Sequence, residues 1–179
     1  MEPGGRPPAP GSLHLVQRFL NTTDGLTGRD LLRTPDDLGR WLSRLGLPAA
    51  GLRGSARQVA SLRRFREALR HAVAARSGGT CDAGAEAILA RAAGRARVSL
   101  RWIGDGAVVV PEGTGADLVM NAVLCALAAT DPGSRRRLNV CAACGWAFYD
   151  RSRNRSGVWC TMSVCGARAK MRRFRQARG

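Results

Sequence analysis

Four cysteines near the C-terminal end, Cys141, Cys144, Cys160 and Cys165, most constrain how this chain can fold. They form a Cys-x2-Cys pair and, fifteen residues later, a Cys-x4-Cys pair. Paired thiols at short spacing are typical ligands of a tetrahedral zinc ion. Four thiolates leave no coordination position for water or substrate, so the sequence predicts one structural Zn²⁺. Disulfide pairing and unconnected free thiols are the alternatives that the spacing leaves open.

The segment that carries these cysteines is also the most basic part of the 179-residue chain. Residues 135–179 contain twelve Lys and Arg and one acid, Asp150, whereas residues 1–134 contain seventeen basic and twelve acidic residues. About 45 residues bury too little apolar surface to fold alone, so metal-binding energy would act as folding energy. Phosphate contacts supply most of the affinity of small basic modules for nucleic acid. DNA is therefore the expected partner, with RNA as an open alternative.

The composition changes along the chain and predicts four segments. Residues 1–11 are rich in Pro and Gly and are expected to be a disordered tail, and residues 12–130 form a helical domain. Residues 131–137 are expected to be a linker and residues 138–179 the zinc finger, so residues 1–130 should fold alone. No apolar leader follows Met1, and the longest apolar run, 118–129, is too short to span a bilayer. No membrane partner and a cytoplasmic location are expected.

Apolar residues at helical spacing predict five helices in the N-terminal domain. They cover roughly residues 12–20, 35–45, 56–76, 82–93 and 116–130, the last of which should be the central core helix. The arginines of the third helix are expected on its other faces: Arg57, Arg63, Arg64, Arg66 and Arg70. Around Gly104-Asp105-Gly106, alternating and β-branched residues predict a β-hairpin. The fold class is therefore mainly α with a small β-hairpin (α+β), followed by a small zinc-stapled finger of knuckles and a helix.

A basic helix is expected after the last cysteine, ending near Gln176. On one face Ala167, Met171 and Phe174 should pack against the zinc knuckles. A neighbouring face carries a basic ridge with the spacing i, i+4, i+7, formed by Arg168, Arg172 and Arg175. Lys170 and Arg173 extend this basic surface to either side. Such a ridge fits DNA phosphates or the major groove. A solvated face on an arginine-rich chain is the alternative.

The loop between the two cysteine pairs carries three more arginines. Arg151, Arg153 and Arg155 alternate with Ser152 and Asn154. On an extended segment this alternation would place all three guanidinium groups on one side, where they could clamp phosphates or contact guanine edges.

Residues across the C-terminal segment resemble the CGNR zinc finger, a bacterial module at the C-terminus of transcription regulators. The resemblance is carried by Cys141-x2-Cys144, Phe148, Asp150, Ser152, Asn154, Trp159-Cys160-x-Met162, Cys165-Gly166 and Lys170. The tetrapeptide that gives the family its name reads Cys165-Gly166-Ala167-Arg168, with alanine in place of asparagine. The N-terminal part is similar to the companion ABATE domain through Phe19-Leu20-Asn21-Thr22, Pro35-x2-Leu38-x2-Trp41-Leu42 and Gly46-Leu47. The resemblance implies an association with regulation.

Together with the basic finger, this resemblance implies a bacterial transcription regulator that binds DNA through its zinc finger. The N-terminal domain would act as a sensor or oligomerisation domain, which allows a homodimer. Asn21 and Thr22 are candidates for a pocket that binds a small-molecule effector, although a helix C-cap or a turn at the end of the first helix explains them as well. The alternative function is a zinc-finger adaptor that binds RNA or an acidic protein. His14 and His71 belong to no catalytic motif, so no enzymatic activity is expected.

Overall fold

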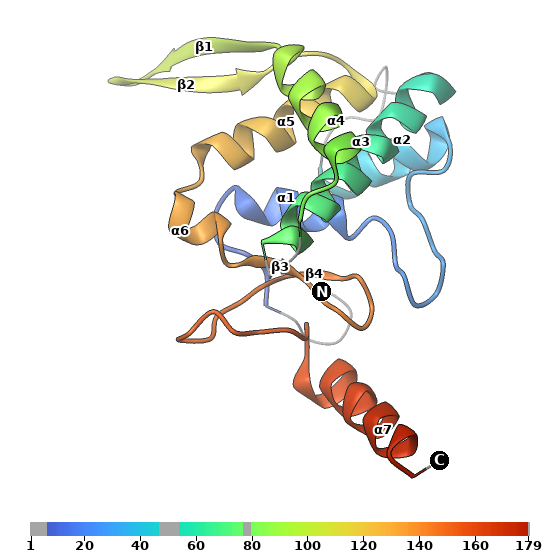
Figure 1. The fold of residues 1–179 in the computed structure, drawn as a ribbon. Helices are drawn as coiled ribbons and strands as arrows, with labels where there is room; N and C mark the ends of the chain where they lie inside the picture. Colours follow the sequence, from blue (N-terminus) through green and yellow to red (C-terminus); the bar gives the residue numbers. More distant parts are fainter. Residues whose placement is uncertain (1–6, 47–53, 77–79, 179) are drawn as a thin grey trace.

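The computed structural model describes residues 7–46, 54–76 and 80–178 (Figure 1). The chain begins with α1 (Leu13–Leu20), α2 (Pro35–Arg44), α3 (Ala56–Ala75) and α4 (Ala83–Gly94). The hairpin β1 (Val98–Ile103) and β2 (Gly106–Pro111) precedes α5 (Gly115–Ala129) and the short α6 (Pro132–Arg135). The C-terminal part contains β3 (Leu138–Val140), β4 (Ala147–Tyr149), the π-helical turn η1 (Met162–Gly166) and α7 (Ala167–Gln176). The predicted fold class, mainly α with a small hairpin and a zinc-stapled finger, is confirmed.

Helices α2 and α3 begin where side chains satisfy free backbone N–H groups. Thr34 accepts a hydrogen bond from the Asp37 N–H while Asp37 accepts one from the Thr34 N–H, and Ser55 and Gln58 make the same reciprocal pair at the start of α3. Such capping boxes fix the first turn of a helix. None of the described helices has the length and apolar character needed to cross a membrane.

Both α1 and α5 contribute side chains to the hydrophobic core. Five of the eight residues of α1 are buried, compared with six of the fifteen residues of α5. Phe19 of α1 lies against the rings of Trp41 and Phe65, with centroid distances of 6.3 and 5.8 Å. Helix α5 packs against α1, α2, α3 and β2, and its apolar side chains belong to the same core, as expected of a core helix.

Part of the segment expected to be a disordered tail is packed against this core. Residues 1–6 of the expected disordered tail lie outside the described residues. Ala9 is buried, and its backbone N–H donates to Oε1 of the buried Gln17 at 2.6 Å. Ala9 is therefore not part of a disordered tail, because the buried Gln17 fixes its backbone.

The β3–β4 ribbon shares the core of the helices. Leu138 and Ala147 are fully buried in the same hydrophobic cluster as Phe19 and Phe65. The segment before β3, expected to be a linker, contains α6, whose first turn is capped by Asp131. The start of the zinc finger is thus packed directly against the helical domain, below α1 and α3 in Figure 1.

Candidate metal centre

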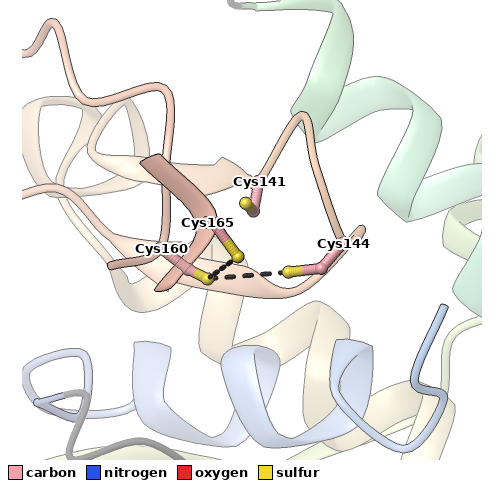
Figure 2. A group of neighbouring side chains, drawn as sticks. All are labelled: Cys141, Cys144, Cys160 and Cys165. Carbon is pink, nitrogen blue, oxygen red and sulfur yellow. Dashed lines mark hydrogen bonds between the residues drawn. The ribbon is translucent and has the colours of Figure 1, made fainter. Parts of the chain in front are cut away.

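The four C-terminal cysteines converge on one point, as Figure 2 shows. Their sulfur atoms all lie within 4.8 Å of one another, and Cys160 Sγ is 3.6 Å from both Cys144 Sγ and Cys165 Sγ. None of the four forms a disulfide. The zinc–sulfur bond length of about 2.3 Å requires sulfur separations of about 3.8 Å in a tetrahedron. The donor type, number and spacing fit a structural Zn²⁺, so the predicted ligand set forms the zinc-binding site.

The protonation of these thiols depends on where the backbone N–H groups point. Burial opposes ionisation of Cys141, but hydrogen bonds from the backbone of Cys160, Ala143 and Cys144 outweigh it and lower the pKa of Cys141 to about 7. Burial raises the pKa of Cys144, and it raises the pKa of Cys160 to about 11. Zinc binds thiolates, so metal binding at neutral pH would displace protons from Cys144 and Cys160.

The first cysteine pair lies on a tight turn between β3 and β4, which we call the first knuckle (residues 141–146). The Cys141 N–H donates to the Trp146 carbonyl at 2.9 Å, and the Gly145 N–H donates to the Cys141 carbonyl at 2.9 Å. Gly145 has φ +71°, a left-handed conformation that glycine adopts without steric cost. The turn therefore presents both sulfurs on the same side.

Side chains of the helical domain hold the first knuckle in place. Asn21 Nδ2 donates to the Ala147 carbonyl at 2.9 Å, and the Ala147 N–H donates to Asn21 Oδ1 at 2.7 Å. Arg70 donates to the carbonyls of both Leu20 and Gly145. A Cβ atom at Gly25 would lie only 2.8 Å from the Cys144 carbonyl oxygen, so the loop after α1 touches the knuckle backbone.

A buried ion pair fixes the loop that makes this contact. Both terminal nitrogens of Arg66 donate to the Asp30 carboxylate at 2.8 Å, and Arg66 also donates to Thr22 Oγ1 at 2.9 Å. Burial of Asp30 opposes its ionisation, but hydrogen bonding from Arg66 outweighs burial and lowers the pKa of Asp30. The expected outward positions of Arg66 and Arg70 are wrong. Their charges are satisfied inside by carboxylates and carbonyls, which helical spacing does not reveal.

The candidate pocket residues Asn21 and Thr22 are both buried and hydrogen-bonded. Asn21 bonds the β4 backbone, whereas the Thr22 hydroxyl donates to the Phe19 carbonyl at 2.7 Å and accepts from Arg66. The second of the two interpretations, a turn at the end of α1, describes their contacts. Their shared position joins the helical domain to the zinc finger.

The loop between the cysteine pairs is a turn and not an extended segment. The buried Asp150 carboxylate accepts the N–H groups of Ser152 and Gly157, both at 2.8 Å. Arg155 has φ +52°. The alternation of Arg151, Arg153 and Arg155 therefore does not place them in one row, although all three are exposed. Arg151 also donates to the Pro8 carbonyl at 3.0 Å and lies over the Tyr149 ring, 5.6 Å from its centroid.

Helix α7 follows the last cysteine as expected but projects from the molecule (Figure 1). Ala169 is its only buried residue, and Met171 and Phe174 are 52% and 49% exposed. The expected packing of Ala167, Met171 and Phe174 on the knuckles is wrong, because the knuckle core is filled by Trp146 and Phe148 instead. All five predicted basic residues of the helix are exposed: Arg168, Lys170, Arg172, Arg173 and Arg175.

Two family models match the chain. The ABATE family, described as "Putative stress-induced transcription regulator", matches residues 13–143, and the CGNR zinc finger matches residues 137–178. The two matches overlap at β3 and Cys141, where the helical core and the finger share residues. No curated protein matches the chain.

Proposed function

The chain belongs to the ABATE family, and we propose that it is a zinc-dependent DNA-binding protein that regulates transcription. The description of the family as a transcription regulator supports nucleic-acid binding. The zinc site would serve as a structural element that fixes the finger, while the helical domain would act as a sensor or oligomerisation domain. The proposal gives the zinc ion no catalytic role, because a closed shell of four thiolates leaves no position for water or substrate.

The projecting helix α7 is the observation that carries this proposal. Its ten residues include five Lys and Arg and no acid, and every one of these cations faces solvent. A solvated surface helix normally mixes both signs of charge, since like charges at helical spacing repel one another. A helix of this length and charge could lie in the major groove or along the phosphate backbone.

The arginines of the loop contribute differently to the proposed DNA surface. Arg151 is held by the Pro8 carbonyl and the Tyr149 ring, so its guanidinium is less free to reach DNA. Arg153 is exposed, at the tip of the turn. If Arg151, Arg153 and Arg155 contact base edges, replacing them should cost about 1–3 kcal/mol on a preferred site and much less on random DNA.

One observation favours the alternative, an adaptor that binds RNA or an acidic protein. Val164 and Met171 form an amphipathic surface with the cations Arg168, Arg172 and Arg175. Phe174 is exposed on the same helix. Exposed aromatic and apolar side chains beside arginines suit base stacking or an acidic amphipathic partner. DNA phosphates need only the cations. Binding that depends on the apolar side chains would therefore distinguish the adaptor function from DNA binding.

A salt titration tests DNA binding by α7. We expect the zinc-loaded protein to bind duplex DNA with an affinity that falls as salt rises. Replacing Arg168, Arg172 and Arg175 with Ala should weaken binding to all sequences and lower the log-affinity versus log-salt slope by about 3, because each phosphate contact releases counterion. Fluorescence anisotropy of a labelled duplex measures both quantities.

A matched control removes the same charge elsewhere. Arg57, Arg64 and Arg91 are exposed residues of α3 and α4, and replacing them with Ala lowers the net charge equally. This control should leave the slope nearly unchanged. Equal losses in the two triple variants would mean that net charge alone attracts DNA. An unchanged affinity in the α7 variant, together with loss of RNA or protein binding in Met171→Ala and Phe174→Ala, would establish the adaptor function instead.

A further inference from the structure

A second basic surface lies on the side of the molecule where α3 ends against the zinc finger. A groove of about 690 Å³ runs between the end of α3, β3, the first knuckle and the loop after Asp150. Three arginines from different elements line it: Arg76, Arg136 and Arg155. None of the described residues that line it is acidic. The groove is separate from α7, none of whose residues contributes to it.

The arginines of the groove are not neutralised by the described part of the protein. Arg76 donates to the Leu138 carbonyl at 3.1 Å, which holds its guanidinium against β3. Neither Arg136 nor Arg155 pairs with a carboxylate among residues 7–46, 54–76 and 80–178. Partial burial, and then the nearby charge of Arg135, lower the pKa of Arg76. Bringing several cations together costs free energy, and a bound anion would relieve this cost.

The backbone at Arg155 adds a second, independent observation. Its φ of +52° lies in the left-handed region, and it is the one residue other than glycine with positive φ in the described part of the chain. An arginine in this conformation is held there at some cost by the surrounding turn, which Asp150 organises through the N–H groups of Ser152 and Gly157. The turn directs the chain so that Arg155 lines the groove.

Much of the wall between the cations is apolar, and the polar residues Asn139 and Ser156 also line the groove. Ala74, Val140, Ala142 and Val158 line the groove, and Val158 is 51% exposed. A bare phosphate ion would leave most of this volume and these walls unused. Guanidinium groups bind phosphate through paired N–H donors and also stack on planar rings, whereas apolar walls favour a flat, poorly hydrated body. The combination fits a phosphate joined to a planar ring.

We propose that this groove binds a nucleotide, with its phosphate held by Arg136 and Arg155 and its base against the apolar walls. The ligand would contact α3, the segment before β3 and the loop between the cysteine pairs at once. Binding would therefore stabilise the arrangement of the helical domain and the finger. The nucleotide could be a free mononucleotide or one unit of a bound DNA strand; only the second source rests on the proposed function.

Calorimetric titration of the full-length, zinc-loaded protein tests the groove. The probes are AMP, GMP, CMP and UMP, followed by a DNA duplex. We expect Arg136→Gln combined with Arg155→Gln to weaken binding at least about tenfold, since charge-assisted hydrogen bonds to phosphate are lost. The matched control, Arg91→Gln with Arg95→Gln, removes two exposed charges from the end of α4 and should change affinity less than about twofold.

The outcomes separate the two sources and the two proposals. The first possible result is that a mononucleotide binds the wild-type protein and raises its Tm, and that the groove variant loses both effects. This result establishes a free nucleotide as the ligand. The second possible result is that no mononucleotide binds, but the log-affinity versus log-salt slope for the duplex falls by about 2 in the groove variant and not in the control. This result establishes that the groove binds a nucleotide of the DNA strand. No mononucleotide binding and unchanged duplex binding would overturn the groove proposal. DNA binding that survives loss of the α7 cations counts only against the role proposed for α7, because the mononucleotide titrations do not involve that helix.

Discussion

The two halves of the zinc finger relate to the rest of the molecule in opposite ways. The docked half, residues 138–149, places Leu138 and Ala147 in the core of the helical domain, where neither is exposed to solvent. The projecting half, residues 162–176, buries only Cys165, Gly166 and Ala169. Cys141 and Cys144 belong to the first half and Cys165 to the second. The zinc site therefore joins an element of the helical core to a helix that contacts little else, and it sets the direction in which α7 points.

Truncation gives the largest effect that this comparison predicts. A protein ending at residue 130 loses the burial of Leu138 and Ala147 and leaves buried partners such as Asn21 and Arg70 without their hydrogen bonds. We expect a loss of at least about 5 kcal/mol from a total of roughly 5–15 kcal/mol, measured by chemical denaturation. The shared core thus argues against the independent folding of residues 1–130 that the predicted linker suggested.

Deletion of α7 alone is the control for that truncation. A protein ending at Gly166 keeps all four cysteines and the docked half. It should unfold within about 1 kcal/mol of the full chain, because α7 buries a single alanine. If both truncations destabilise equally, the two halves do not differ as described.

Zinc removal should disorder the projecting half more than the docked half. A chelator should unfold η1 and α7 while most of the helical signal from α1 to α5 remains, since those helices have their own core. Hydrogen exchange monitored by mass spectrometry would locate the loss. Exchange that rises equally in α1 and α7 would show that the helical core also depends on the metal.

The affinity for zinc should depend steeply on pH. The pKa of Cys160 is raised to about 11 and that of Cys144 is raised as well, so both thiols are protonated in the metal-free protein at pH 7 and must lose their protons to bind zinc. Affinity should therefore fall as pH falls, by about 100-fold or more per pH unit for two protons released. Competition with a chromophoric chelator at pH 6, 7 and 8 measures this slope. A slope below about tenfold per unit would mean that fewer protons are displaced.

A smaller effect is expected from the residue that joins α1 to β4. Asn21→Ala leaves the backbone N–H and carbonyl of Ala147 without their side-chain partner, at a cost of about 2–3 kcal/mol. Asn154→Ala, in the exposed turn between the cysteine pairs, is the matched control and should cost less than about 0.5 kcal/mol. Thermal or chemical denaturation of the two variants measures the difference.

Sequence patterns predicted the local elements and the metal ligands but missed how they pack. Cysteine spacing identified the zinc ligands because coordination geometry restricts which spacings work, and capping residues such as Thr34 marked helix starts. The roles of Arg66 and Arg70 were missed, since their partners are a distant carboxylate and distant carbonyls. Asn21 was identified as important for a different reason, a ligand pocket. Contacts between residues more than a hundred positions apart leave no periodic signal in one sequence.

The smallest effect on stability concerns the apolar face of α7. Phe174 is 49% exposed, with its ring facing the Arg178 guanidinium at 4.2 Å from the centroid, so Phe174→Ala should change the free energy of unfolding by no more than about 0.5 kcal/mol. Trp146→Ala is the contrasting change, because Trp146 is buried in the cluster around the cysteines and its loss should cost about 3–5 kcal/mol. Chemical denaturation of both zinc-loaded variants gives the two values. A cost above about 1 kcal/mol for Phe174→Ala would mean that α7 packs against the knuckles, as the sequence predicted, and that its apolar face is not available to a partner.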